Sequence, residues 1–170
     1  KGVFCVETDR VSVLNIIDRI NSDLVIQKKI LQHRDLSKLN PSSVNTVRVL
    51  SMLRTNEVMI YSVIIRMGIN GARVDNASSG GITCGVENYG ALKRVAYAAN
   101  GEKYDYHPTT KVPFSSVRIP NFNKVIELVK YSHPMVPHFR LVSWDIAIDV
   151  AGEPVLIEDN LKYGELDFHQ

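Results

Sequence analysis

The spacing of apolar residues along the chain predicts two helices. In residues 9–21 the apolar positions recur at intervals of three and four, which places them on one side of a helix. Residues 121–133 repeat this spacing directly after the turn formers Pro120 and Asn121. The positions that define the two helices are Val13, Ile16, Ile17 and Ile20 in the first, and Phe122, Val125, Leu128 and Val129 in the second.

Shorter apolar and alternating runs predict a set of strands. Such runs are typical of strands when they are rich in β-branched residues and end at turn formers. They occupy residues 3–6, 23–31, 44–53, 58–67, 82–86, 142–149 and 155–160. The tract 89–113 is polar and rich in turn formers, so we expect irregular structure there. Strands followed by isolated helices favour an α+β fold with a mainly antiparallel sheet and flanking helices.

The most regular alternation lies in residues 141–160 and predicts a β-hairpin. Apolar and polar side chains alternate on both halves, around a tight turn at residues 151–152. If the strands close symmetrically about this turn, Asp145 lies opposite Glu158, and Asn160 lies further along the same face. An odd number of residues in the turn would shift this register.

The side chains that this register brings together suit a divalent cation. Asp145 and Glu158 repel each other across a strand pair, so we expect a positive charge beside them. Asn160, which the same register places opposite Ser143, adds an amide oxygen on this face. Such oxygens are ligands that Mg²⁺ prefers, and Mg²⁺ usually arrives with a nucleotide triphosphate. An ordinary hairpin whose acids face water explains the same spacing equally well.

Two arginines on predicted strands need anionic partners. Arg48 lies in residues 44–53 and Arg66 in residues 58–67, each among apolar neighbours. An arginine in such surroundings is stable only when its charge is paired. A phosphate would serve, because the planar guanidinium binds oxyanions through parallel hydrogen bonds. A structural salt bridge explains each arginine equally well.

Composition limits the classes of function. The 170-residue chain carries a net charge of +2 with scattered basic residues, so we expect no nucleic-acid partner and no attraction to a membrane surface. The apolar runs are too short for membrane insertion. Cys5 and Cys84 are too few for a disulfide framework and lack metal-ligand spacing, which fits free thiols in the cytoplasm.

Five short motifs follow one another in a recognisable order. They are Lys1-Gly2-Val3-Phe4, VIQKKI at residues 25–30, Asn45-Thr46-Val47-Arg48, VDNASSGG at residues 74–81, and Trp144-Asp145 followed by Glu158-Asp159-Asn160. In this order they resemble the ATP-grasp superfamily, most closely its sugar-transfer-associated branch, which is related to alpha-L-glutamate ligases. The resemblance covers nearly the whole chain.

The resemblance implies a Mg²⁺ site in the hairpin. Asp145, Glu158 and Asn160 match the family's metal ligands, in agreement with the chemistry of the paired strands. Lys162 matches a basic residue that the family places close to the phosphate. A solvated lysine is the alternative interpretation of Lys162.

The resemblance also implies an ATP site in the first part of the chain. Lys1 and Gly2 match the end of the family's glycine-rich loop. In the hinge strand that follows, the backbone groups of Lys28 and Ile30 would bind the adenine edge, with Gln27 beside them. An ordinary strand with solvated lysines is the alternative.

The loop at residues 74–81 matches the acceptor or phosphate side of the family's cleft. Its two adjacent glycines allow the backbone to approach a ligand closely. Asp75 and Asn76 can order the turn through their own backbone. As an isolated signal the loop predicts only a turn.

The resemblance implies that the chain is part of a longer enzyme. Residues 1–37 would be a remnant of the central ATP-grasp subdomain, and residues 38–170 the C-terminal lobe with the metal-binding hairpin. The N-terminal lobe of the same polypeptide would then be truncated here. Because that lobe forms half of the nucleotide clamp, we expect the isolated fragment to be inactive.

The leading hypothesis is the Mg²⁺-ATP-binding part of a carboxylate–amine or carboxylate–thiol ligase that acts through an acyl phosphate. Its substrates would be a small carboxylate and an amine or sugar-linked acceptor. The parent enzyme would serve cell-surface polysaccharide or amino-acid conjugate assembly. The alternative is a non-catalytic nucleotide-binding module of the same fold, associated with sugar transfer. A kinase that phosphorylates a sugar or small alcohol is a third hypothesis.

Overall fold

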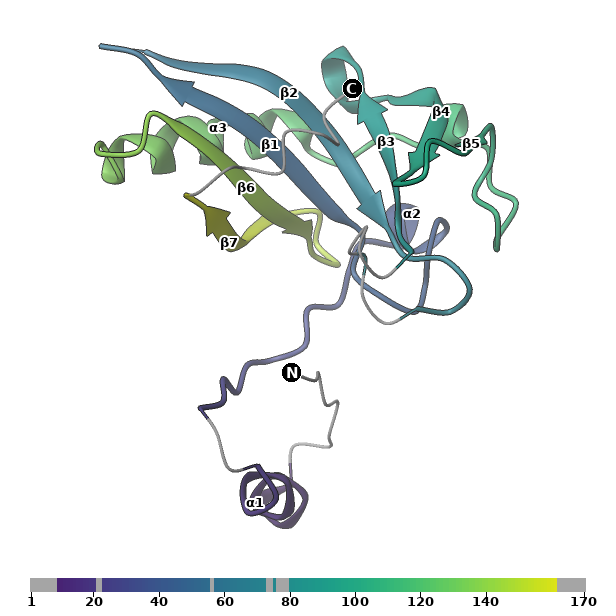
Figure 1. Ribbon diagram of the computed structural model, residues 1–170, viewed down its shortest axis with the longest axis vertical. Coiled ribbons are helices and arrows are strands. Elements are labelled where there is room, and N and C mark those ends of the chain that lie inside the picture. The colour runs from purple at the N-terminus through teal and green to yellow at the C-terminus, as the bar shows by residue number, and fades with distance from the viewer. Residues whose placement is uncertain (1–8, 21–22, 56, 73–74, 76–79, 162–170) are drawn as a thin grey trace. The chain divides into compact units, whose positions relative to one another are not determined.

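The chain divides into two compact units, Lys1–Ile30 and Leu31–Gln170 (Figure 1). The computed structural model describes residues 9–20, 23–55, 57–72, 75 and 80–161. The strand predicted at residues 3–6 lies outside the described residues. Assignment of the two units to ATP-grasp subdomains stays a prediction.

The described part of the first unit contains the helix α1 (Arg10–Ile17). It confirms the helix predicted at residues 9–21, with a shorter span. The strand predicted at residues 23–31 is wrong, because no strand of the described residues pairs with this segment. Val25 and Ile26 are 86% and 64% exposed. An apolar run forms a strand only where neighbours bury its side chains and bond its backbone.

The second unit is built on an antiparallel sheet. Within the described residues the sheet has seven strands in the order β5-β4-β3-β2-β1-β6-β7. The strands are β1 (Thr46–Leu53), β2 (Val58–Met67), β3 (Ile82–Val86), β4 (Leu92–Ala98), β5 (Lys103–Tyr104), β6 (Leu141–Ile148) and β7 (Pro154–Asn160). This architecture confirms the predicted α+β fold with a mainly antiparallel sheet.

Most of the predicted strands are confirmed, and one tract is corrected. The hairpin predicted from residues 44–53 and 58–67 is β1 and β2, and the next apolar run is β3. The prediction of irregular structure for residues 89–113 is wrong, because β4 and β5 lie in that tract. Only Leu92 and Ala96 are buried in β4, and charged residues stand between them, so the tract lacks a strand-like pattern.

Short helices complete the second unit. They are α2 (Arg34–Ser37), α3 (Phe122–Ser132) and the 3-10 helices η2 (Asn88–Gly90), η3 (Phe114–Ser116) and η4 (His133–Met135). The second predicted helix is confirmed as α3, which buries Val125 and Val129. Among the described residues, none of the helices combines the length and apolar character needed to cross a membrane.

The two faces of the sheet differ in chemistry. Apolar side chains of β1, β2 and β6 form one core with α3, which lies across one side of the sheet (Figure 1). The intervening residues of the same strands point to the opposite face. Several of these are polar and buried, among them Arg48, Arg66 and Asp145. The sheet therefore holds a buried polar cluster on the face away from α3.

Cys84 is a buried free thiol on β3, as predicted. Burial raises the pKa of Cys84 to about 12, so the thiol stays protonated and unreactive at neutral pH. The other cysteine, Cys5, lies outside the described residues.

A buried hydrogen-bond network ties β1 to β6 and η4. The Trp144 Nε1 donates to Ser51 Oγ at 2.7 Å, and Ser51 Oγ lies 2.8 Å from His133 Nδ1. The His133 Nε2 lies 2.9 Å from the carbonyl of Phe139, which can only accept, so Nε2 carries the proton. In the neutral ring the other nitrogen accepts from the Ser51 hydroxyl, and one serine serves two buried rings.

Replacing Ser51 with alanine should destabilise the fold, because Trp144 and His133 lose their shared buried partner. A buried polar group without a partner costs about 1–3 kcal/mol. Urea unfolding should show a lower midpoint for Ser51→Ala than for the wild type. The control Ser115→Ala, at an exposed serine, should behave as the wild type. Equal midpoints for both variants would show that the network adds no stability.

His107 is a buried histidine that forms a hydrogen bond with the start of the loop after β2. Its Nε2 lies 3.0 Å from the carbonyl of Gly68 and donates to it, and its Nδ1 accepts from the backbone N–H of Thr110. Beside it, the Thr109 hydroxyl accepts from the backbone N–H of Asn70. Burial lowers the pKa of His107 below its usual 6.5, and the hydrogen bond to Gly68 opposes this only in part. The fold therefore favours the neutral ring.

Acid should weaken the fold through His107. Between the lowered pKa of the folded chain and 6.5, the unfolded chain binds a proton that the folded chain does not. The stability that neutral His107 contributes is therefore complete above the pKa of the unfolded chain. It is lost as the pH falls below that pKa. From about pH 7.5 to about pH 5.5, the unfolding free energy should fall further in the wild type than in His107→Gln.

The control for this effect is His138→Gln, at an exposed histidine, which should keep the wild-type pH dependence. Chemical denaturation at each pH provides the measurement. If His107→Gln and the wild type lose stability in parallel, proton uptake by His107 has no part in acid sensitivity.

Candidate functional site

A row of charged side chains crosses the polar face of the sheet. Glu158 on β7 lies opposite Asp145 on β6, and Asp145 lies opposite Arg48 on β1. Residues directly opposite each other on neighbouring strands share a face, so the three charges stand in line. Asn160 lies opposite Ser143 on the same face. Both hairpin pairings predicted from the sequence are confirmed.

The hairpin reaches this pairing through a bulge. Its turn has an odd number of residues, because Asp149 and Glu153 pair at the base, so the predicted two-residue turn is wrong. Continued without interruption, this register would place Asp145 opposite Ile157. A β-bulge at Ile157 shifts the register by one residue and brings Glu158 opposite Asp145 instead.

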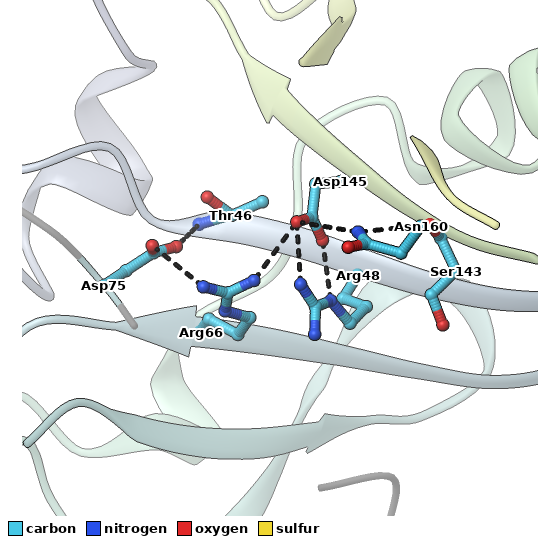
Figure 2. Close-up of polar contacts among 7 residues, drawn as sticks. All are labelled: Thr46, Arg48, Arg66, Asp75, Ser143, Asp145 and Asn160. Atoms are coloured by element: carbon cyan, nitrogen blue, oxygen red, sulfur yellow. Dashed lines mark hydrogen bonds and ion pairs between the residues drawn. The ribbon is translucent and has the colours of Figure 1, made fainter. Parts of the chain in front are cut away.

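Asp145 is the centre of the polar cluster. Arg48 binds it through two hydrogen bonds, from Nε to Oδ1 at 2.7 Å and from Nη2 to Oδ2 at 2.8 Å. Arg66 adds a third, from Nη1 to Oδ2 at 3.1 Å (Figure 2). The exposed fractions of Arg48, Arg66 and Asp145 are 2%, 6% and 3%.

These contacts decide between the alternatives for the hairpin and the arginines. Asp145 does not face water, so the interpretation as an ordinary solvated hairpin is wrong for this acid, whereas Glu158 is exposed, as that interpretation predicts. Arg48 and Arg66 supply the positive charge predicted beside the paired acids. The salt bridge considered for each arginine is therefore present, and it joins both arginines to one carboxylate.

Arg66 has a second carboxylate partner, Asp75, that sequence reasoning missed. The Arg66 Nη2 lies 3.4 Å from Asp75 Oδ1, and Asp75 Oδ2 accepts from the backbone N–H of Thr46 at 3.2 Å. Thr46 lies opposite Arg66 in the β1–β2 register. We predicted only that Asp75 orders its own loop. The one available signal was an acid that follows β2, a strand whose penultimate residue, Arg66, needs a partner.

Asn160 joins the cluster from the end of β7. Its Nδ2 lies 3.4 Å from Asp145 Oδ2 and 3.5 Å from the carbonyl of Ser143 (Figure 2). The amide therefore stands beside the Asp145 carboxylate. A ligand bound by Asp145 on this face would also be within reach of Asn160.

The two acids of the row titrate differently. Burial raises the pKa of Glu158, and the neighbouring Asp145 carboxylate raises it further through a hydrogen bond and its charge. Burial acts on Asp145 in the same direction, but the hydrogen bonds and charges of Arg48 and Arg66 outweigh it and lower the pKa of Asp145. Asp145 is therefore ionised. Glu158 is the acid whose ionised form a further cation nearby would stabilise.

The other predicted site residues lie outside the described part of the second unit. Outside the described residues lie Lys1, Gly2 and Lys162. Gln27, Lys28 and Ile30 belong to the first unit, where they form no strand. Their contacts with a nucleotide stay predictions.

Comparison with known families shows where this arrangement belongs. Residues 10–170 match the family described as sugar-transfer associated ATP-grasp. The chain belongs to that family. The match confirms the resemblance to the ATP-grasp superfamily, with the first motif, Lys1-Gly2-Val3-Phe4, lying outside the matched residues. ATP-grasp domains are generally ATP-dependent ligases. Neither a curated protein nor a solved structure matches the chain.

The ATP-grasp fold generally binds ATP with Mg²⁺, and the predicted metal ligands lie in this cluster. Asp145, Glu158 and Asn160 offer oxygen ligands of the kind that Mg²⁺ prefers. With two arginines and three acids, the cluster carries one net negative charge when all its groups are ionised. The described residues hold no group of three or more His, Cys, Asp or Glu side chains that could bind a metal. The predicted ligand set contains only two such side chains, Asp145 and Glu158, because its third oxygen comes from the amide of Asn160.

Asp145→Asn should strongly destabilise the fold, because Arg48 would remain buried without its compensating charge. Breaking a buried pair in this way costs about 3–5 kcal/mol. The matched control is Asp105→Asn, which breaks an exposed pair with Arg94 of a kind that contributes about 0–1 kcal/mol. The free energies of unfolding in urea provide the comparison. Small, similar losses in the two variants would be inconsistent with a buried pair.

Proposed function

We propose that this chain is the Mg²⁺-ATP-binding part of a carboxylate–amine or carboxylate–thiol ligase that acts through an acyl phosphate. The observation that carries the proposal is the polar cluster, in which two acids and an amide lie in register beside two buried arginines. Burying Arg48 and Arg66 together with Asp145 is costly, and such buried charges are concentrated at functional sites. Membership of the ATP-grasp family supports this use of the cluster.

In this proposal Asp145, Glu158 and Asn160 hold Mg²⁺. When bound, Mg²⁺ would neutralise negative charge on the phosphate oxygens of ATP. Arg48 acts as a positioning residue, because its two parallel hydrogen bonds fix the plane of the Asp145 carboxylate. The raised pKa of Glu158 is consistent with an acid whose ionised form is stabilised by a bound cation.

Arg66 is the arginine that we assign to phosphate. Arg48 commits its Nε and Nη2 to Asp145, whereas Arg66 contacts Asp145 through a single hydrogen bond at 3.1 Å. Arg66 can therefore turn from Asp145 toward a phosphate oxygen with the loss of fewer and longer hydrogen bonds to that carboxylate than Arg48 would lose. Lys162, which follows the hairpin, would assist at the phosphate or acyl phosphate.

The nucleotide-binding site would be completed by residues of the first unit and by a further lobe. Lys1 and Gly2 would cover the phosphates, and the backbone of Lys28 and Ile30, with Gln27 beside it, would bind adenine. The N-terminal lobe of the same polypeptide would close the clamp. We place the enzyme in the cytoplasm, in polysaccharide or amino-acid conjugate assembly.

The proposed reaction has two steps. A carboxylate oxygen of the substrate attacks the γ-phosphorus of ATP, and ADP leaves. The nitrogen or sulfur of the acceptor then attacks the acyl carbon, loses its proton and releases phosphate. The protein contributes chiefly position and charge, which is typical of phosphoryl transfer.

Glu158→Gln in the full-length protein should abolish Mg²⁺-dependent ATP turnover and leave the fold intact. Removing one charged contact to a transition state typically lowers kcat on the order of 10²–10³-fold. The control Glu153→Gln changes an exposed acid of the same hairpin and should keep full turnover. The measurement is release of ADP and phosphate with a panel of carboxylates. Undiminished turnover in Glu158→Gln would exclude its role as a ligand.

The same assay separates the rival hypotheses. Calorimetric binding of Mg²⁺-ATP without phosphate release for any carboxylate would favour a non-catalytic nucleotide-binding module. Transfer of the γ-phosphate to the hydroxyl of a sugar or small alcohol, which yields a stable phosphate ester, would identify a kinase. Phosphate release that depends on both a carboxylate and an acceptor is the outcome expected for the ligase.

A further inference from the structure

The Asp145 carboxylate has unequal oxygens. Its Oδ2 lies within hydrogen-bond distance of three donors: Arg48 Nη2 at 2.8 Å, Arg66 Nη1 at 3.1 Å and Asn160 Nδ2 at 3.4 Å. Its Oδ1 accepts from Arg48 Nε at 2.7 Å. A carboxylate oxygen offers about two lone-pair directions, so Oδ2 is already fully used. A cation that binds Asp145 through Oδ2 must therefore compete with these donors.

Arg66 is the charged donor most easily displaced from Asp145. Arg48 would have to give up two short hydrogen bonds, whereas Arg66 would give up one longer bond. A displaced arginine that stays 6% exposed still needs an anion nearby. Asp75 already supplies one, because its Oδ1 lies 3.4 Å from Arg66 Nη2 (Figure 2).

Asp75 has its own anchor on the sheet. Its Oδ2 accepts from the backbone N–H of Thr46 at 3.2 Å, so each oxygen of Asp75 has a different partner. The Thr46 amide belongs to β1, and its bond does not depend on Arg66. Asp75 is also largely buried, with 13% of its side chain exposed. Its carboxylate can therefore stay in place while Arg66 shifts.

We propose that Asp75 is a positioning residue that retains Arg66 at the site when a divalent cation binds Asp145 through Oδ2. The inference rests on the proposed function, in which Asp145 is a metal ligand. Cation and Arg66 compete for Asp145, and Asp75 relieves the competition by offering Arg66 a second carboxylate. Without Asp75, Arg66 binds Asp145 more firmly and opposes the cation.

A double-mutant cycle in the full-length protein tests this inference. Mn²⁺ alone is titrated into the protein, and the free ion is measured from its electron paramagnetic resonance signal. Asp75→Asn should weaken Mn²⁺ binding about tenfold, a typical coupling between sites. In the Arg66→Gln background the same change should have a much smaller effect, because the competing charge is gone. The control Asp105→Asn, at an exposed acid, should leave Mn²⁺ binding unchanged.

The outcomes separate the inference from the function on which it rests. If Asp75→Asn weakens Mn²⁺ binding equally with and without Arg66, Asp75 acts only through its own charge and the inference is overturned. If the wild type does not bind Mn²⁺ saturably and has no Mg²⁺-dependent turnover, the proposed function fails and the inference falls with it. A folded Asp75→Asn that binds Mn²⁺ as the wild type does also overturns the inference.

Discussion

The buried ion pair between Arg48 and Asp145 is the interaction on which the second unit depends. The two residues lie 97 positions apart in the chain and directly opposite each other on β1 and β6. Neither charge has access to water that could replace its partner, so each makes the other's burial tolerable. The two parallel hydrogen bonds also fix orientation. A single contact therefore sets the relative position of two distant segments and aims the carboxylate at the polar face.

The strand β1 links the fold to the candidate site. One set of its alternate residues packs in the core with α3, and Ser51 on that side joins Trp144 and His133. The other set carries Thr46 and Arg48 into the polar cluster. Stability and proposed chemistry thus share one strand, with the core on one face and the charges on the other.

The parts of the structure that could be predicted from sequence are those with a local pattern. The acids of the last hairpin alternate with apolar residues over a short span, which predicted that they share a face. Their pairing was predicted correctly from a turn that is wrong, because the bulge at Ile157 offsets the extra residue of the turn. The need of Arg48 and Arg66 for anionic partners followed from their apolar neighbours. The strand predicted at residues 23–31 failed because an apolar run does not reveal whether a pairing strand exists.

Features that depend on long-range geometry could not be predicted. The contact between Asp75 and the Thr46 amide joins residues 29 positions apart, and nothing in the loop sequence specifies its path back to β1. The strand β4 was missed because only two of its residues are buried. The proposed nucleotide contacts of the N-terminal residues depend on long-range geometry, which a local sequence pattern does not specify.

The bulge at Ile157 also affects how related hairpins should be aligned. Counting outward from the turn matches Asp145 with an apolar residue, so an alignment anchored on the turn would overlook the acid across from it. Anchoring on the pair Trp144 and Asp159, beyond the bulge, restores the correspondence. Homologues whose turns differ in length could therefore keep the same pair of acids while appearing to lack one.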